Sequence, residues 1–334
     1  MDAVPPLDAA APAVEVHGLV REFKGGIRAV DELDLEVHGG EIYGFLGPNG
    51  AGKTTLVRIL TTLLRPTSGT ARVAGFDVVA EADSVRRSIG VALQEAAIDP
   101  LMTGRELLRM QGALHGLRGS EAKARATSLL DRVGLTDAAD RRVGGYSGGM
   151  RRRLDLALAL VHRPDVLFLD EPTTGLDPTS RAALWREVRA LNDEGTTVFL
   201  TTQYLEEAEQ LADRVGIIAA GRLEAEGTPN DLKARVGAPM LIVTVDDPAD
   251  AEAAREALRE LGEVEPAGAG DTPARVVLHT SAGKGAIPPA IRALDERGVA
   301  VESVEVETPT LDDVFAAVTG SRLEGAAQPE ASPA

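Results

Sequence analysis

The stretch GPNGAGKT, residues 47–54, decides how this chain folds. It follows an apolar strand pattern, IYGFL at 42–46, and opens a helical pattern, TTLVRILTTLL at 54–64. This is the order of strand, glycine-rich loop and helix that the G-x-x-x-x-G-K-[ST] motif requires. Glycines let backbone N–H groups close around phosphates, and the N-terminus of the helix adds its positive end. The sequence therefore predicts a site for a nucleoside triphosphate.

Two side chains of this loop have separate predicted roles. Lys53 can reach the β and γ phosphates, and the hydroxyl of Thr54 can ligate Mg²⁺. A glycine-rich turn with a solvated lysine is the alternative, and the completeness of the motif in its context argues against it. The predicted nucleotide-binding residues of the loop are Gly47, Pro48, Asn49, Gly50, Ala51, Gly52, Lys53, Thr54 and Thr55.

A second motif, VLFLDEP at 166–172, supplies carboxylates. Its apolar residues predict a buried strand, and Asp170 and Glu171 emerge at the carboxyl end, where α/β proteins place their sites. Asp170 is expected to hold Mg²⁺ directly or through a water, and Glu171 is expected to polarise the attacking water as a general base. An exposed acidic strand end is the weaker interpretation because the same chain carries the phosphate loop.

Composition restricts the class of protein. The chain has 334 residues, of which 44% are hydrophobic, 26% charged and only 3% aromatic, so its core must consist of Val, Leu, Ile and Ala. The formal net charge of -17 argues against a broad contact with nucleic acid, which needs clustered Lys and Arg. With no cysteine, no signal-peptide pattern and no apolar run long enough to span a bilayer, the chain is expected in the cytosol, reaching a membrane only through a partner.

The order of patterns predicts the domains. Short β-rich runs alternate with helical patterns, which indicates a mainly parallel sheet covered by helices; the first two runs, VEVHGLV and LDLEVH, are assigned to it. Helical patterns alone fill a subdomain at about 96–164. After GTPNDLKARVGAP at 227–239, the runs MLIVTV, ARVVLHT and VAVESVEV alternate with two helices. They predict a small α+β domain closed by LDDVFAAVTG, with EPAGAGDTP as its exposed loop. The predicted boundaries are 1–12 disordered, 13–228 nucleotide-binding domain, 229–320 accessory domain and 321–334 disordered.

The motifs occur in one order: GPNGAGKT, Gln94 in VALQEA, YSGGM at 146–150, VLFLDE and GLDP at 175–178. In this order residues 14–228 resemble the nucleotide-binding subunit of ATP-binding-cassette (ABC) transporters. The resemblance implies a P-loop cassette with a helical subdomain, ATP and Mg²⁺ as cofactors, and a head-to-tail homodimer that sandwiches two ATP molecules. It also implies that Gln94 senses Mg²⁺ and the attacking water, and that Asp177 lies at the dimer seam.

The signature segment departs from the family pattern, because SGGM replaces the usual SGGQ. Ser147 can still cap the following helix and present the amides of Gly148 and Gly149 to a γ-phosphate. By the same resemblance Phe23 occupies the place of the ring that stacks on adenine, although it could instead fix the loop against the sheet. Gln203 stands where most members have a histidine. A primary amide can donate one hydrogen bond to the γ-phosphate, as imidazole does, but cannot take up a proton near neutrality.

Three segments narrow the resemblance. YSGGMRRR, TTQYLEEA and PTLDDVFAAVTG together resemble the daunorubicin/doxorubicin-resistance type of bacterial drug-export ATPase, and they extend the match to about residue 320. The resemblance implies export of a drug or hydrophobic natural product through a separate integral-membrane permease, at the cytoplasmic face of the cell membrane. The helical insertion at about 96–145 is the expected docking surface.

Other functions use the same phosphate loop. A soluble ABC ATPase acting on DNA or ribosomes would need a long heptad insertion or a second cassette, and neither is visible in the sequence. A small-molecule kinase would leave YSGGM and GLDP unexplained. The accessory domain could strengthen the dimer, contact the permease or regulate hydrolysis, and its sequence does not choose among these roles.

Overall fold

The computed structural model describes residues 12–93, 98–265 and 274–320. Its contacts divide the chain into two compact units. The first unit comprises the chain up to Pro229 and the residues from Val318 onward, and the second unit is Asn230–Ala317. Each is described by itself. The predictions for residues 1–11, 94–97, 266–273 and 321–334, which include Gln94 and most of EPAGAGDTP, lie outside the described residues.

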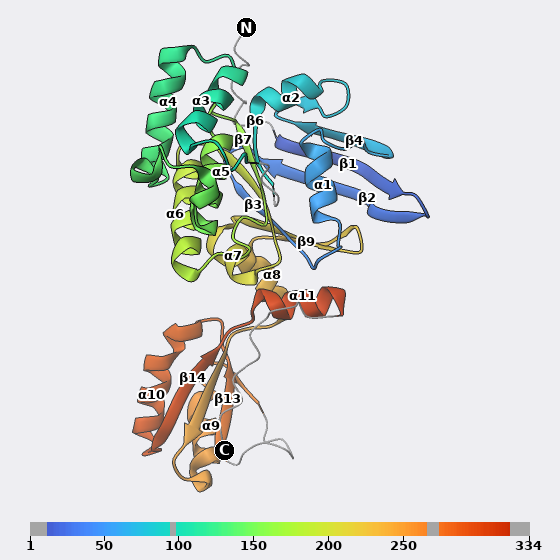
Figure 1. The fold of residues 1–334 in the computed structure, drawn as a ribbon. Helices are drawn as coiled ribbons and strands as arrows, with labels where there is room; N and C mark the ends of the chain where they lie inside the picture. Colours follow the sequence, from blue (N-terminus) through green and yellow to red (C-terminus); the bar gives the residue numbers. More distant parts are fainter. Residues whose placement is uncertain (1–11, 94–97, 266–273, 321–334) are drawn as a thin grey trace. The chain divides into compact units, whose positions relative to one another are not determined.

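A six-stranded sheet forms the centre of the first unit (Figure 1). Its order is β10-β9-β3-β8-β7-β6, and only the edge strand β10 pairs antiparallel with its neighbour. The ring of Phe199 on β8 packs within 6 Å of the rings of Phe45 and Phe168 on the flanking strands, with centroids 5.7 and 5.5 Å away. The strands are β3 (Ile42–Leu46), β6 (Ile89–Ala92), β7 (Val166–Asp170), β8 (Thr197–Thr202), β9 (Arg214–Ala219) and β10 (Arg222–Gly227).

Alternate residues of these strands enter two different cores. Leu167, Leu169 and Leu200 pack with the helices on one face, and Phe168 and Phe199 pack with α1 and a second sheet on the other. Both faces are therefore buried, as is usual for parallel strands. The predicted α/β fold with a mixed, mainly parallel sheet is confirmed. The covering helices are α1 (Lys53–Leu60), α2 (Ala82–Ser88), α5 (Gly148–Ala159), α6 (Pro178–Asp193) and α7 (Leu205–Leu211).

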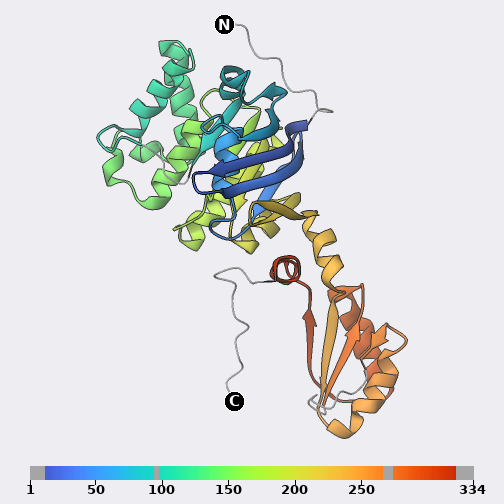
Figure 2. The same ribbon diagram turned by 90° about the vertical axis from the view of Figure 1, so that its right-hand side faces the viewer.

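The first two predicted strands do not belong to the parallel sheet, so that assignment was wrong. They pair with each other antiparallel in a separate four-stranded sheet of order β2-β1-β4-β5, the blue layer of Figure 2. The reason is the short connection 24–26, since a parallel pair needs a crossover of a dozen or more residues. The strands are β1 (Pro12–Phe23), β2 (Ile27–His38), β4 (Ser68–Val73) and β5 (Phe76–Asp77).

The range predicted as a helical subdomain, about 96–164, contains α3 (Gly104–Leu114), α4 (Gly119–Arg132) and α5. Thr103 and Glu106 form a reciprocal capping box that starts α3. Two short 3₁₀ turns, Thr136–Ala138 and Val143–Gly145, connect α4 to α5. Helices α3 and α4 lie together at one side of the sheets in both views (Figures 1 and 2).

The second unit has the predicted alternation of strands and helices, with one short strand, β12, that the sequence did not reveal. Its sheet is antiparallel with the order β12-β13-β11-β14. Leu241, Val243, Leu258 and Leu294 are among the residues of a core separate from those of the first unit. The elements are α8 (Pro229–Val236), β11 (Met240–Val245), α9 (Ala251–Leu258), β12 (Glu263–Val264), β13 (Arg275–His279), α10 (Ile287–Glu296), β14 (Val301–Glu307) and α11 (Leu311–Thr319).

Candidate active site

The glycine-rich loop connects β3 to α1 and encloses a small cavity. Gly52 has φ +111° and caps α1, and a Cβ atom there would lie 2.1 Å from the carbonyl oxygen of Ala29. A Cβ atom on Gly47 would lie 2.5 Å from the carbonyl oxygen of Ile218. Only glycine fits these two positions. The cavity has a volume of about 230 Å³ and is lined by Ala29, Pro48, Asn49, Gly50, Gly52, Lys53, Thr54, Thr55 and Glu171.

Lys53 extends back along the loop. Its Nζ donates to the carbonyl oxygens of Gly47 and Pro48, at 2.6 and 3.1 Å, and lies 3.3 Å from Oε1 of Glu171. The side chain is only 4% exposed. Burial lowers the pKa of Lys53, and the Glu171 carboxylate opposes that change. The loop therefore holds an amine in the cavity wall beside a carboxylate that could be exchanged for a phosphate.

Asp170 ends β7, Glu171 follows it, and their side chains diverge. Oδ1 of Asp170 accepts hydrogen bonds from the hydroxyls of Thr201 and Thr54, at 2.5 and 3.4 Å. Oδ2 of Asp170 is buried and has no hydrogen-bond partner among the described residues. Glu171 has φ +47°, a left-handed backbone conformation that is costly for a side chain of this kind, and its N–H donates to Thr201. This turn directs one carboxylate toward Thr54 and the other toward Lys53.

Gln203 occupies the bend that follows β8. The N–H of Gly47 donates to the carbonyl oxygen of Thr202 at 3.3 Å, which places the residue after Thr202 beside the start of the phosphate loop. The hydroxyl of Thr202 accepts from the N–H of Tyr204 at 2.9 Å and fixes the bend. Gln203 is half-buried and does not line the cavity. Gln203 is therefore next to the site because the backbone of the preceding residue, Thr202, contacts Gly47.

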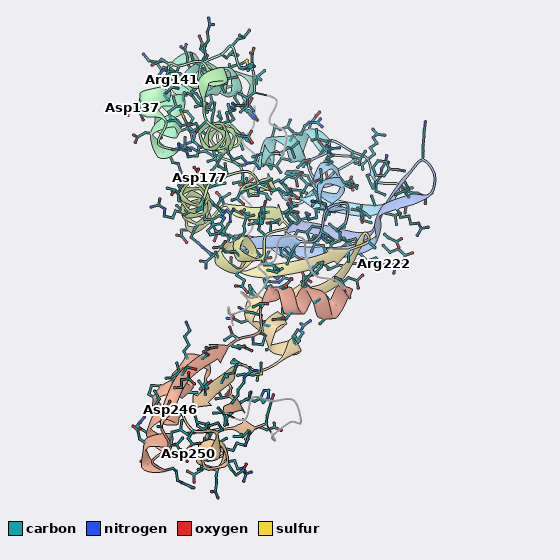
Figure 3. The ribbon with its side chains drawn as sticks, turned by 60° about the horizontal axis from the view of Figure 1, so that its bottom comes forward. Asp137, Arg141, Asp177, Arg222, Asp246 and Asp250 are labelled. Atoms are coloured by element: carbon teal, nitrogen blue, oxygen red, sulfur yellow. The ribbon has the colours of Figure 1, made fainter. Side chains whose placement is uncertain are left out.

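The signature residues lie elsewhere on the first unit. Ser147 caps α5, with its hydroxyl accepting from the N–H of Met150 at 3.2 Å. Gly149 approaches α6 so closely that a Cβ atom on it would lie 2.8 Å from Oγ of Ser180. Asp177 caps α6 by accepting from the N–H of Ser180 at 3.0 Å and is labelled in Figure 3. Ser147, Gly148, Gly149 and Asp177 are all absent from the lining of the phosphate cavity.

Phe23 lies at the end of β1 and is 40% exposed. The guanidinium of Arg21 stacks on its ring, 4.7 Å from the centroid, and donates to the carbonyl oxygen of Arg65. Phe23 does not line the cavity either. The ring is thus supported on one face and partly open.

Sequence reasoning missed Thr201, which connects both carboxylate residues to the neighbouring strand. The only signal for it was a hydroxyl residue at the end of the apolar run VFL. Its position opposite Asp170 follows from the parallel pairing of β7 with β8. That register cannot be deduced from either strand alone.

No helix in the part of the chain that the structure describes has both the length and the apolar character needed to cross a membrane.

Comparisons with known proteins agree with this geometry. A family model described as ABC transporter matches residues 30–174, and a model described as ATP-binding protein DrrA1-3-like, C-terminal domain, matches residues 227–319. The daunorubicin resistance ATP-binding protein DrrA2 of Streptomyces coeruleorubidus is 48% identical over 320 residues, covering 96% of this chain and 99% of that protein. The daunorubicin/doxorubicin resistance ATP-binding protein DrrA of Streptomyces peucetius is 48% identical over 331 residues, covering 96% of each.

Among solved structures, a dimeric ATP-binding cassette in a post-hydrolysis state with ADP and Pi superposes with a TM-score of 0.60. It is 26% identical and covers 64% of this chain and 98% of that one. The cassette motifs, their geometry and the matching C-terminal domain give one conclusion: the chain belongs to the ABC transporter family, as an ATP-binding, ATP-hydrolysing subunit of the daunorubicin/doxorubicin-resistance type.

Proposed function

We propose that this chain energises the export of a drug or hydrophobic natural product through a separate integral-membrane permease, at the cytoplasmic face of the membrane. The observation that carries the enzymatic part is that Lys53, Thr54 and Glu171 line one cavity. Asp170 is not in the lining, but its Oδ1 lies 3.4 Å from the hydroxyl of Thr54. The export part is supported by the resistance proteins that match nearly the whole chain. The transported compound passes through the permease, so the residues of this chain do not identify it.

The residues present fit a magnesium ion. Oδ2 of Asp170 is a buried carboxylate oxygen without a partner among the described residues, and the Thr54 hydroxyl is 3.4 Å from the other oxygen of the same carboxylate. Such oxygens are the ligands that Mg²⁺ prefers. Bound Mg²⁺ would neutralise charge on the β and γ phosphates. Gln94, the third proposed ligand, lies outside the described residues.

The other side chains then have distinct proposed roles. Glu171 accepts a proton from the attacking water, and Lys53, beside it in the cavity wall, binds the β and γ phosphates. Gln203 donates a hydrogen bond to the γ-phosphate, and Phe23 stacks on adenine through its open face. The two catalytic residues of this proposal are Glu171 and Gln203.

We further propose a homodimer in which a second copy completes each site. Ser147, Gly148 and Gly149 present the N-terminus of a helix but do not line the cavity that holds Lys53. A partner copy arranged head to tail would bring its signature residues and Asp177 to this cavity. The dimeric cassette that superposes on the first unit supports this arrangement.

The permease is proposed to dock on the helical insertion at about 96–145. A groove of about 470 Å³ is lined by Gln111 and His115 of this insertion and by residues of α2, β6, α5 and the segments that follow α1, β6 and α5. Leu63, one of the lining residues, is 60% exposed. A short amphipathic helix of the permease that faces the cytoplasm would fill such a groove with its apolar side. Leu63→Asp should weaken copurification with the permease and leave the ATPase rate of the isolated chain unchanged.

The test of the enzymatic proposal is ATP hydrolysis by the purified full-length chain with Mg²⁺, beside Glu171→Gln. Wild type should hydrolyse ATP, and the variant should accumulate as an ATP-bound dimer, measured by light scattering with and without ATP. A Glu171→Gln variant that turns over ATP at the wild-type rate would remove the general-base role. A variant that binds ATP yet stays monomeric would contradict the sandwich.

A further inference from the structure

Three consecutive arginines follow the signature glycines on α5, and their side chains point to three different places. Arg151 donates to the carbonyl oxygen of Tyr146 at 3.2 Å, beside the start of its own helix. Arg153 donates to the carbonyl oxygen of Val133 at 2.9 Å, at the C-terminal end of α4. Arg152 instead reaches the end of β7, which leads to the carboxylates, and the end of the neighbouring strand β6. A run that looks like a solvated basic surface in the sequence thus contains one arginine directed at the site.

The guanidinium of Arg152 contacts the backbone on both sides of Glu171. Nη2 donates to the carbonyl oxygen of Asp170 at 2.9 Å, and Nε donates to that of Pro172 at 2.8 Å. Nη1 donates to the carbonyl oxygen of Leu93, directly after β6, at 2.8 Å. One side chain therefore connects α5 to the carboxyl ends of two neighbouring strands.

Asp155 holds this side chain in place. Its Oδ2 accepts from Nη1 of Arg152 at 3.1 Å, and the side chains of Arg152 and Asp155 are 12% and 11% exposed. Asp155 and Leu93 both line the groove of about 470 Å³ described above. The orientation of Arg152 is thus fixed from the side of the groove, while its other contacts are with the segment around Glu171.

We propose that Arg152 is a positioning residue for hydrolysis: it sets the place of Glu171 by holding the carbonyl groups before and after it, and so ties that place to α5. A planar guanidinium can donate to several acceptors in fixed directions, whereas the ammonium of a lysine cannot reproduce this fork. In the proposed dimer, α5 begins at the residues that meet the partner's nucleotide. Arg152 would thus connect α5, which contacts one ATP molecule, to the carboxylate of Glu171, which acts on the other ATP molecule. The link between the two sites, though not the local contact, rests on the proposed function.

The experiment compares Arg152→Lys and Arg152→Gln with Arg153→Gln, a matched change one residue along the same helix. The equilibrium dissociation constant for ATP, kcat and hydrogen exchange of the backbone at 168–173 are measured for each full-length protein. Both Arg152 variants should lose about 100-fold in kcat, as a small misplacement of a catalytic group does, with the affinity for ATP nearly unchanged. Exchange at 168–173 should become faster. Arg153→Gln should change neither kcat nor this exchange.

Arg152→Lys guards against a general folding defect, because it keeps the charge and the length of the side chain. If Arg152→Lys has the melting temperature of wild type and a low kcat, the loss of kcat is caused by the position of Glu171 and not by lower stability. Wild-type kcat in Arg152→Lys, or unchanged exchange at 168–173 in both variants, would overturn the proposal. If wild type itself neither hydrolyses ATP nor dimerises, the proposed function fails, and the exchange measurement still decides whether Arg152 holds the segment around Glu171.

Discussion

At the scale of the residue, the site is organised by two adjacent carboxylates with different surroundings. Asp170 is held by threonine hydroxyls, and Oε1 of Glu171 lies 3.3 Å from Nζ of Lys53 in the cavity wall. Consecutive side chains in a strand point to opposite faces of the sheet. The left-handed backbone at Glu171 departs from that geometry. The strain is therefore associated with a Glu171 carboxylate that lines the cavity beside Lys53, while Asp170 contacts the hydroxyl of Thr54.

Gln203 allows a prediction about hydrogen bonding to the γ-phosphate. Gln203→Ala should reduce kcat by about 100-fold, the usual effect of removing one donor to developing charge, with little change in ATP affinity. Gln203→His should retain hydrolysis and make the rate depend on pH near 6.5, because an imidazole titrates there. Steady-state rates from pH 5.5 to 8.5 check both. An alanine variant as fast as wild type would remove Gln203 from the mechanism.

Gly52 allows a prediction about the loop. Gly52→Ala should abolish ATP binding and lower the free energy of unfolding by about 3 kcal/mol, because its Cβ would collide with the Ala29 carbonyl. Gly40→Ala is the control: φ is +77° there as well, but nothing lies within 4 Å of the added atom. It should cost about 1 kcal/mol and leave ATP binding intact. Denaturant titration and equilibrium binding give the two quantities; equal effects in the two variants would mean that the collision does not matter.

At the scale of the element, motifs predicted the features that depend only on residues close together in the sequence. The phosphate loop, the buried strand before Asp170 and the helix that begins after Ser147 were recognisable because sequence and local conformation coincide there. Thr201 and Arg152 were not, since their roles depend on strand register and on the rotation of α5. The sequence also missed β4, whose pattern of burial is mostly exposed, and β6, which is only four residues long.

Two histidines connect elements at the groove. The ring of His162 stacks on His115 at the end of α3, with centroids 3.9 Å apart, and its Nε2 is 2.9 Å from the carbonyl oxygen of Ile89 on β6. Since a carbonyl only accepts, Nε2 carries the proton, and Nδ1 is buried without a partner among the described residues. Burial, helped by the neighbouring His115, lowers the pKa of His162 to about 4.

This lowered pKa predicts a pH dependence of stability. The unfolded chain takes up a proton at about pH 6.5, before the folded one does, so the contribution of His162 is complete above that pH. This contribution to the free energy of unfolding decreases as the pH falls toward 4, by at most about 3 kcal/mol. Burial raises the pKa of Asp155 to about 6, so this carboxyl makes the free energy of unfolding change with pH in the opposite direction over the same pH range. For this reason the stability of wild type is compared with that of His162→Asn, in which Asp155 is retained. The stability difference between them should shrink between pH 7 and pH 4; a constant difference would contradict the assignment.

At the scale of the whole molecule, the two units have separate hydrophobic cores. We expect calorimetry of the full chain to show two unfolding transitions, of which ATP with Mg²⁺ raises only the one that belongs to the cassette. At 100 times its dissociation constant, ATP should stabilise that transition by about 2.7 kcal/mol. A chain that ends at Pro229 serves as the control and should keep only the transition that responds to ATP. One transition that shifts as a whole would show that the units unfold together.

The separation of Ser147, Gly148 and Gly149 from the cavity that holds Lys53 has a genetic consequence. A Lys53→Ala chain and a Gly149→Asp chain should each be inactive alone. In a mixed dimer of the proposed head-to-tail kind, the intact loop of the second chain would face the intact signature of the first. One whole site would then be restored while the other carries both defects. With random pairing, mixing equal amounts should recover roughly a quarter of wild-type turnover. Two null alleles would thus complement each other in one cell.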